Sequence, residues 1–145
     1  MSESLRQRAL RLLAQREHAR SELKRKLAAH AESEEQVDAL LDDLVARRLL
    51  SDARYAEMRV SVRGNRYGNA RLAQELRQQE IDADITAEVL AGAGDELQRA
   101  RGVWARKFGT LPGNADERAR QIRYLMYRGF SGDVIRRLLR GEAEE

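Results

Sequence analysis

An internal repeat with a period of 49 residues constrains the fold of this chain more than any other feature of its sequence. Leu27, Leu76 and Leu125 are spaced by 49 residues, and further columns of apolar residues keep the same offset without gaps. The period also aligns three residues of types that favour helix N-caps, namely Ser33, Asp82 and Ser131. Because three copies of this length cover essentially the whole chain of 145 residues, we expect three similar units.

Each copy contains three stretches in which apolar residues recur at helical spacing, as Leu72 and Leu76 do. The expected helices cover residues 4–16, 19–30, 33–48, 51–64, 69–79, 82–91, 95–109, 116–128 and 131–140. The sequence therefore predicts an all-α fold of three tandem three-helix repeats. We place the units at residues 1–50, 51–94 and 95–145, the last with an acidic tail (142–145). Units stacked in a row should form an elongated, curved body with a long continuous surface.

One helix end carries a specific expectation. Gly129 should occupy the position just past a helix end, where φ is positive. Phe130 is then expected to fold back towards Leu125.

Aromatic residues at helical spacing are expected to belong to the core. Tyr55 with Val62, and Trp104 with Leu111, are the pairs that keep this spacing. Asp116 is expected to cap the helix that follows the longest loop.

Residue types and spacings argue against catalysis and against metal or cofactor binding. The chain has no cysteine, and its two histidines, His18 and His30, do not have metal-ligand spacing. His18 and Glu22 are four residues apart, so we expect a surface pair. The segment RGNRYGN (63–69) lacks the Lys-Ser/Thr of a phosphate loop and any preceding strand. We expect a non-enzyme with no cofactor and no small-molecule substrate.

Neither a membrane span nor a signal peptide is expected. No apolar run approaches the roughly 20 residues that cross a bilayer, and Met1 is not followed by a signal-peptide core. We therefore expect a cytoplasmic protein. We also expect it to be a monomer.

Charge alternates along the chain in step with the repeat. Net charge is +6 over residues 6–31, −5 over 32–52, +4 over 53–79, −6 over 80–98 and +8 over 99–140. One interpretation is that basic and acidic helices pair within or between units. It fits the third unit poorly, because the charge of that unit has no acidic complement. An uncompensated basic segment is typical of a surface that binds phosphates or an acidic protein.

We assign partner or nucleic-acid binding to cationic residues of the second and third units and to one aromatic residue among them. Tyr67 lies in a basic loop and is the best candidate for an exposed aromatic contact. The candidates are Arg63, Arg66, Tyr67, Arg71, Arg77, Arg106, Lys107, Arg118, Arg120, Arg123 and Arg128.

Two segments carry motifs that are specific when taken together. Residues 49–81 have an acidic-aromatic entry (SDARYA) and then Gly-x-x-x-Leu-x-x-Glu-Leu, from Gly68 to Leu76. Residues 124–139 (YLMYRGFSGDVIRRLL) contain a Gly-Phe-Ser turn followed by a helix that ends in Leu. Each motif is weakly specific, but the two in this order at this chain length resemble the RecX family of bacterial regulators of the RecA recombinase. The sequence departs from the family at "RQQEI", where a Lys-Gly pair is common, so Glu80 stands where a glycine would end the helix. If Glu80 takes the left-handed conformation, this costs on the order of 1 kcal/mol.

The resemblance implies three three-helix repeats and a non-enzymatic protein that binds in the helical groove of RecA–DNA filaments. Blocking filament extension or promoting disassembly would lower strand exchange, ATP hydrolysis and coprotease activity. The resemblance also implies weak DNA binding and a role in DNA repair, recombination and the SOS response.

Two alternatives stay open beside the resemblance. One is a direct DNA-binding regulator, since trihelical units are similar to helix-turn-helix folds. Against it, the third helices of units one and two are acidic and suit the major groove poorly. The other is a structural adaptor that binds a different acidic protein.

Overall fold

The computed structural model describes residues 2–141, and within that range it contains nine α-helices and no strand. The helices are α1 (Leu5–Gln15), α2 (Arg20–Ala28), α3 (Glu34–Ala46), α4 (Asp52–Arg63), α5 (Asn69–Gln78), α6 (Ala83–Ala91), α7 (Glu96–Lys107), α8 (Ala115–Tyr127) and α9 (Gly132–Leu139). Every end lies within two residues of its predicted position. The all-α prediction and the three tandem three-helix repeats are confirmed. The acidic tail (142–145) lies outside the described residues.

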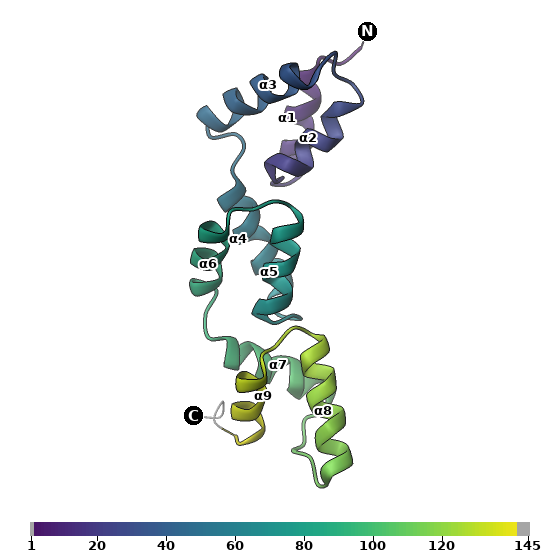
Figure 1. Cartoon of the computed structure of the whole chain (residues 1–145), viewed down its shortest axis with the longest axis vertical. Helices are drawn as coiled ribbons and strands as arrows, with labels where there is room; N and C mark the ends of the chain where they lie inside the picture. The colour runs from purple at the N-terminus through teal and green to yellow at the C-terminus, as the bar shows by residue number, and fades with distance from the viewer. Residues whose placement is uncertain (1, 142–145) are drawn as a thin grey trace.

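Figure 1 shows the three units following one another along the longest axis of the molecule. Unit one comprises α1–α3, unit two α4–α6 and unit three α7–α9. The second helix of each unit (α2, α5, α8) lies on the right of this view, and the third helix (α3, α6, α9) lies to its left. The chain is therefore elongated, and each repeat presents its helices in a similar order along the body.

Each unit has a hydrophobic core of its own. Leu27, Leu76 and Leu125, which show the sequence period most plainly, are all fully buried, one in each core. Ala19 of unit one packs into the core of unit two. A small core per unit leaves much of each helix surface available for contacts between units and with partners.

The predicted helix end at Gly129 is confirmed, and Glu80 also adopts the left-handed conformation. Glu80 has φ 58° and Gly129 has φ 93°. In each turn the next residue donates its backbone N–H to the third-last helical residue: Ile81 to Leu76 O at 3.1 Å, and Phe130 to Leu125 O at 3.2 Å. These bonds are those of a Schellman motif, which satisfies carbonyls at the helix end.

Three predictions about single positions are wrong. The N-cap of α8 is Asn114, whose side chain accepts from Glu117 N–H at 2.9 Å, and Asp116 lies inside the helix. Val62 is 66% exposed, because it is two residues (about 200° of helical rotation) past Val60, which lies on the buried stripe of α4. Leu111 is 49% exposed, because α7 ends at Lys107 and its helical spacing does not reach the loop.

His18 is also placed differently from its prediction as half of a surface pair. Its ring is 1% exposed, with Nδ1 3.0 Å from Arg16 O and Nε2 3.0 Å from Lys26 Nζ. Glu22 instead accepts hydrogen bonds from Arg16. Because a lysine ammonium can only donate, Nε2 accepts and the ring is neutral. Burial lowers the pKa of His18, and the charges of Arg16 and Lys26 add to this effect.

A search of residues 2–141 finds no helix that is both long enough and apolar enough to cross a membrane.

Candidate anion-binding surface

Units two and three meet through backbone hydrogen bonds between the start of α5 and the end of α8. The N–H groups of Gly68 and Ala70 donate to the carbonyls of Arg128 and Gly129, at 2.8 and 3.2 Å. The N-cap residue Gly68 has no side chain to cap α5, and the carboxylate of Glu96 on α7 accepts from the Asn69 N–H at 2.5 Å. The third unit therefore supplies the acceptors that the first N–H groups of a helix require. The two helix ends also meet with opposite partial charges, which favours the contact.

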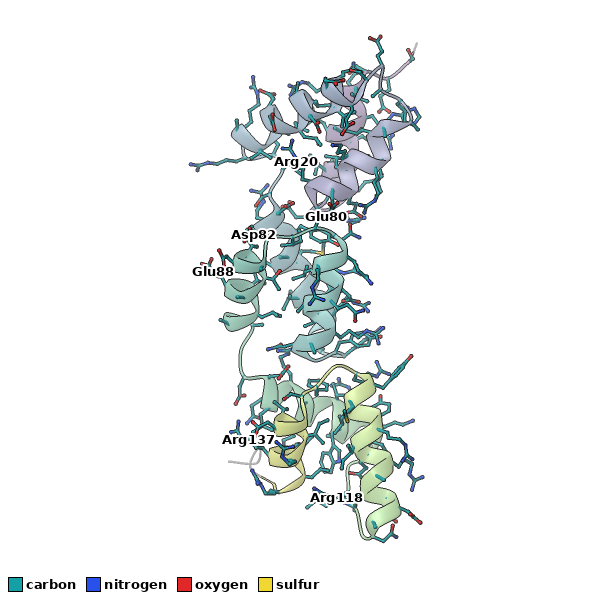
Figure 2. All side chains as sticks on the ribbon, in the orientation of Figure 1. Arg20, Glu80, Asp82, Glu88, Arg118 and Arg137 are labelled. Atoms are coloured by element: carbon teal, nitrogen blue, oxygen red, sulfur yellow. The ribbon has the colours of Figure 1, made fainter. Side chains whose placement is uncertain are left out.

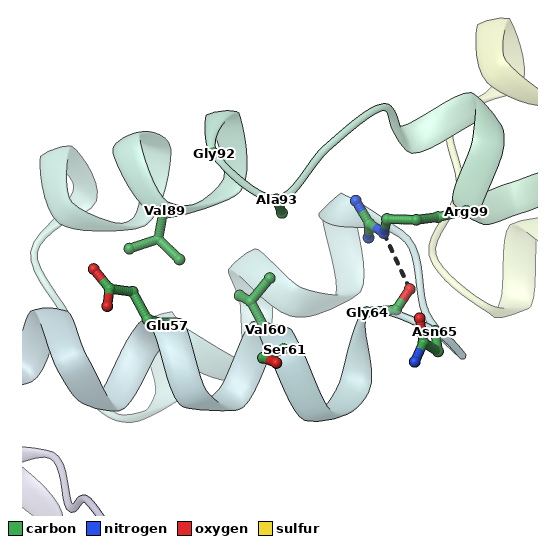
Figure 3. Close-up of a pocket in the computed structure, with 9 residues that line it drawn as sticks. All are labelled: Glu57, Val60, Ser61, Gly64, Asn65, Val89, Gly92, Ala93 and Arg99. Carbon is green, nitrogen blue, oxygen red and sulfur yellow. Dashed lines mark hydrogen bonds between the residues drawn. The ribbon is translucent and has the colours of Figure 1, made fainter.

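Arg99 of α7 fixes the loop that leads into α5. Its guanidinium donates to Gly64 O at 3.0 Å, to Tyr67 O at 3.0 Å and to Asn69 Oδ1 at 2.8 Å. Figure 3 shows the side chain reaching from α7 to Gly64, at the end of a pocket between α4 and α6. Burial lowers the pKa of Arg99. Arg99 thus positions the loop rather than offering its charge to a partner.

The fixed loop and unit three line an open cationic pocket of about 400 Å³, here called the junction pocket. Its lining residues are Arg66, Tyr67, Val103, Arg106, Lys107, Tyr124 and Arg128. The first two come from the α4–α5 loop of unit two, and the others come from α7, α8 and the end of α8. No carboxylate lines the pocket. The structure therefore brings together five of the residues that the sequence singled out.

Cation–π contacts hold the two tyrosine rings of the pocket. Arg128 Cζ lies 5.1 Å from the Tyr67 ring centroid and 5.2 Å from that of Tyr124. Arg63 and Arg71 lie over Tyr67 at 4.5 and 4.2 Å. Tyr67 is partly buried and has arginines over its ring, so its role as an aromatic contact stays a prediction.

The remaining predicted site residues fall into three groups. Arg71 does not line the pocket, but its guanidinium lies over the Tyr67 ring. Arg63 pairs with Glu75 at 2.6 Å, and the hydrogen bond to that carboxylate raises the pKa of Arg63. The others are exposed and have no ion-pair partner within residues 2–141. They are Arg77 on α5 and the three α8 arginines, Arg118, Arg120 and Arg123.

Charge pairing differs among the units. In unit one, basic α2 and acidic α3 neutralise each other, for example through Lys24 with Glu34 and Asp38, both at 3.0 Å. In unit two, Glu88 of α6 is exposed and has no ion-pair partner in the described part of the chain. Figure 2 shows it on the outer side of α6. Pairing of basic with acidic helices is thus confirmed for unit one but does not extend to α6.

Sequence reasoning missed Arg99 as part of this surface and left Tyr124 out of the candidate residues. Arg99 looked like one more charge of the basic third unit, and nothing in the sequence distinguishes a buried arginine that binds carbonyls from an exposed one. Tyr124 lies 49 residues after Glu75 in the repeat, where polarity differs between the copies. The contact between α5 and α8 that completes the pocket spans 60 residues of sequence and has no local signature.

Residues 2–141 hold no group of three or more His, Cys, Asp or Glu side chains arranged to bind a metal ion. The cationic side chains of the junction pocket can bind anions by charge and by hydrogen bonding. The fold and this surface define a tandem three-helix-repeat protein with a cationic face on units two and three.

Comparison with known proteins gives the family. Three successive models match: "RecX, first three-helix domain" at residues 6–44, the second at 51–90 and the third at 94–139. A protein of Chromobacterium violaceum named Regulatory protein RecX is 48% identical to this chain, and the alignment covers 98% of this chain and 93% of the relative. The relative in Leptothrix cholodnii is 51% identical, covering 94% and 88%. The chain belongs to the RecX family.

Two solved structures share the fold. The crystal structure of RecX from Lactobacillus salivarius has a TM-score of 0.81 at 21% identity, covering 97% of this chain and 94% of that one. A crystal structure of regulatory protein RecX has a TM-score of 0.77 at 23% identity, covering 90% and 68%.

Proposed function

We propose that this chain regulates the RecA recombinase without catalysis, by binding in the helical groove of the RecA–DNA filament in the cytoplasm. Binding there would block filament extension or promote disassembly, and so lower strand exchange, ATP hydrolysis and coprotease activity. The name of the family relatives supports a regulatory role. In this proposal, RecA is inferred as the partner from the family, and the binding surface is inferred from the structure.

The observation that carries the proposal is the uneven charge of an elongated body. The α8 arginines and Arg77 are exposed and have no carboxylate partner in the described chain, whereas unit one is neutralised internally. A filament groove repeats along its axis and presents both acidic protein surface and DNA phosphate. An elongated chain can meet several such sites at once, and modest contacts on one body strengthen one another through effective concentration.

A second candidate function is direct DNA binding by a helix-turn-helix mode. The acidic third helices α3 and α6 count against it, because a recognition helix enters the phosphate-lined major groove. Among the third helices of the three units, only α9 is basic, and four of its eight residues are buried in the core of unit three. The proposal therefore assigns DNA a weak contribution through phosphate contacts.

Adding the protein to preformed RecA–DNA filaments, while DNA-stimulated ATP hydrolysis is followed, tests the proposal. We expect hydrolysis to fall as the protein is titrated and to stop falling at saturation. The double variant Arg120→Glu/Arg123→Glu should require more protein for the same effect. Hydrolysis that does not change at saturating wild-type protein would reject filament regulation.

A further inference from the structure

The geometry points to the junction pocket as a phosphate-binding site that units two and three form together. The site takes a phosphoryl group, supplied either by a free phosphorylated small molecule or by a nucleic-acid backbone. It is a property of the chain by itself, and it stands whether or not the chain binds RecA.

The first argument is uncompensated charge. Arg66, Arg106, Lys107 and Arg128 line one pocket, and none of them has an ion-pair partner within residues 2–141. Like charges gathered in one pocket repel one another unless a counter-charge is present. The tyrosine rings offer the cations a quadrupole but no net negative charge. An anionic ligand supplies the missing charge.

The second argument is a donor without an acceptor. Arg128 Nε is buried and has no hydrogen-bond partner in the described chain. Arg59 Nε is in the same condition, but the Arg59 guanidinium lies 4.0 Å from the Glu75 carboxylate, so its charge is partly compensated. The Arg128 guanidinium instead has two tyrosine ring centroids near it, at 5.1 and 5.2 Å from Cζ. A phosphate oxygen in the pocket would accept from this guanidinium and compensate its charge.

The third argument concerns which anion fits. A carboxylate has one charge and two oxygens in a plane, and a single arginine can satisfy it. A phosphate monoester has up to two charges and three strong acceptor oxygens. Four cations lining a pocket of about 400 Å³ exceed the requirement of one carboxylate and match that of a phosphate monoester or of neighbouring backbone phosphates, which carry one charge each. Val103 is the only aliphatic side chain in the lining, so the pocket offers little to an apolar ligand.

The location of the pocket gives the site a mechanical consequence. The Arg128 carbonyl accepts from Gly68 N–H in the contact between units, and the Arg128 side chain lines the pocket. Arg106 also donates to the Asn65 carbonyl across the same junction. A phosphate held by cations of both units therefore favours the docked arrangement of units two and three. Binding should slow hydrogen exchange at the Gly68 and Ala70 amides.

The test is an NMR titration of the isolated full-length chain with inorganic phosphate, at ionic strength held constant with chloride. We expect saturable shifts at Arg128 Nε–H and at the Gly68 amide. Lys107→Gln and Arg128→Gln should each weaken binding at least about 10-fold. Arg47→Gln is the matched control, because it removes one exposed arginine charge from unit one, where Arg47 pairs with Asp43 at 3.0 Å. It should leave binding unchanged.

Two further titrations distinguish the sources of the phosphoryl group. Thymidine 5′-monophosphate tests a free monoester, and an oligothymidylate without terminal phosphates tests an internal backbone phosphate. Preference for either one identifies the source and supports the site. An acetylated glutamate peptide that binds as tightly as phosphate would overturn the choice of phosphate.

The proposal is overturned if shifts with phosphate do not saturate, or if Arg47→Gln weakens binding as much as Lys107→Gln does. Should Arg128→Gln fail to fold, Lys107→Gln decides alone, because Lys107 is exposed and its loss leaves the core intact. Since RecA is absent from these experiments, their failure leaves filament regulation standing, and the failure of filament regulation leaves this site standing.

Discussion

The backbone N–H of Gly68 donates a 2.8 Å hydrogen bond to the carbonyl of Arg128, so that the first turn of α5 meets the last turn of α8. An ideal Cβ added to Gly68 would lie 2.4 Å from Gly129 O, which is too close for any side chain. The φ of Gly68, −83°, is one that every residue can adopt, so backbone conformation does not require a glycine here. The close approach of the two backbones requires it. The same contact positions the loop and Arg128 around the junction pocket.

Gly68→Ala should therefore destabilise the chain by about 1–3 kcal/mol, the usual cost of overpacking. Urea denaturation measures the change. The control is Gly92→Ala, where the added Cβ would come no closer than 3.7 Å to its nearest neighbour and the residue is exposed. A Gly68→Ala midpoint equal to that of Gly92→Ala would contradict the close approach of α5 and α8.

Glu80→Gly should stabilise the chain by about 0.5–1 kcal/mol. A residue with a Cβ is destabilised by about 1–2 kcal/mol in the left-handed region, and glycine avoids this cost. The greater flexibility of glycine in the unfolded state offsets part of that stabilisation. Glu80 is exposed, and its side chain has no partner in the described chain, so no contact is lost. Glu80→Ala keeps the Cβ and should give no gain. Thermal unfolding of the three proteins decides, and equal gains for Gly and Ala would exclude backbone strain as the cause.

Gln121→Leu should destabilise unit three by about 1–3 kcal/mol, because it leaves a buried donor unsatisfied. Trp104 Nε1 donates to Gln121 Oε1 at 2.8 Å, and Gln121 Nε2 donates to Thr110 O at 3.1 Å. The double variant Trp104→Phe/Gln121→Leu removes both indole donor and amide. A double-mutant cycle measured by urea denaturation should show positive coupling, and purely additive effects would argue against this hydrogen bond.

The stability of the chain should fall as pH falls through the histidine range. Burial holds the pKa of His18 below its ordinary value of 6.5, so the unfolded state takes up the proton first. The contribution of His18 is therefore fully present above pH 6.5 and is lost as pH falls below it. Urea midpoints measured from about pH 7.5 to about pH 5.5 should decline. His30→Gln changes an exposed histidine and should keep this decline, whereas His18→Gln should largely remove it.

The fold could be predicted because the repeat places the same residue types at the same structural positions. Leu27, Leu76 and Leu125 occupy core centres, and Ser33, Asp82 and Ser131 cap helices, so pattern and local chemistry agree. Predictions were wrong where the spacing of residues in the sequence does not show which side chains other helices cover in the fold. Val62 and Leu111 have suitable neighbours in sequence, but no helix covers them. His18 is polar in sequence yet buried by contacts that no local pattern shows.

The candidate site was predicted only as a set of charges. Sequence identified Arg66, Arg106, Lys107 and Arg128 as cations, but not that they share a pocket. That arrangement depends on the Gly68–Arg128 contact between units, and on Arg99, which holds the loop by its carbonyls. Such contacts are set by the geometry of docking, which residue types alone do not encode.

The most direct test of the account measures affinity for the RecA–DNA filament and for bare DNA across a salt series, for wild type and for Arg120→Glu/Arg123→Glu. Arg47→Glu in unit one is the control for charge reversal outside the proposed surface, and it reverses one charge rather than two. We predict that wild type prefers the filament, and that the double variant binds it more weakly with a shallower salt dependence. Arg47→Glu should behave like wild type. A steep salt dependence with no preference for the filament, or a double variant that binds like wild type, would contradict the account.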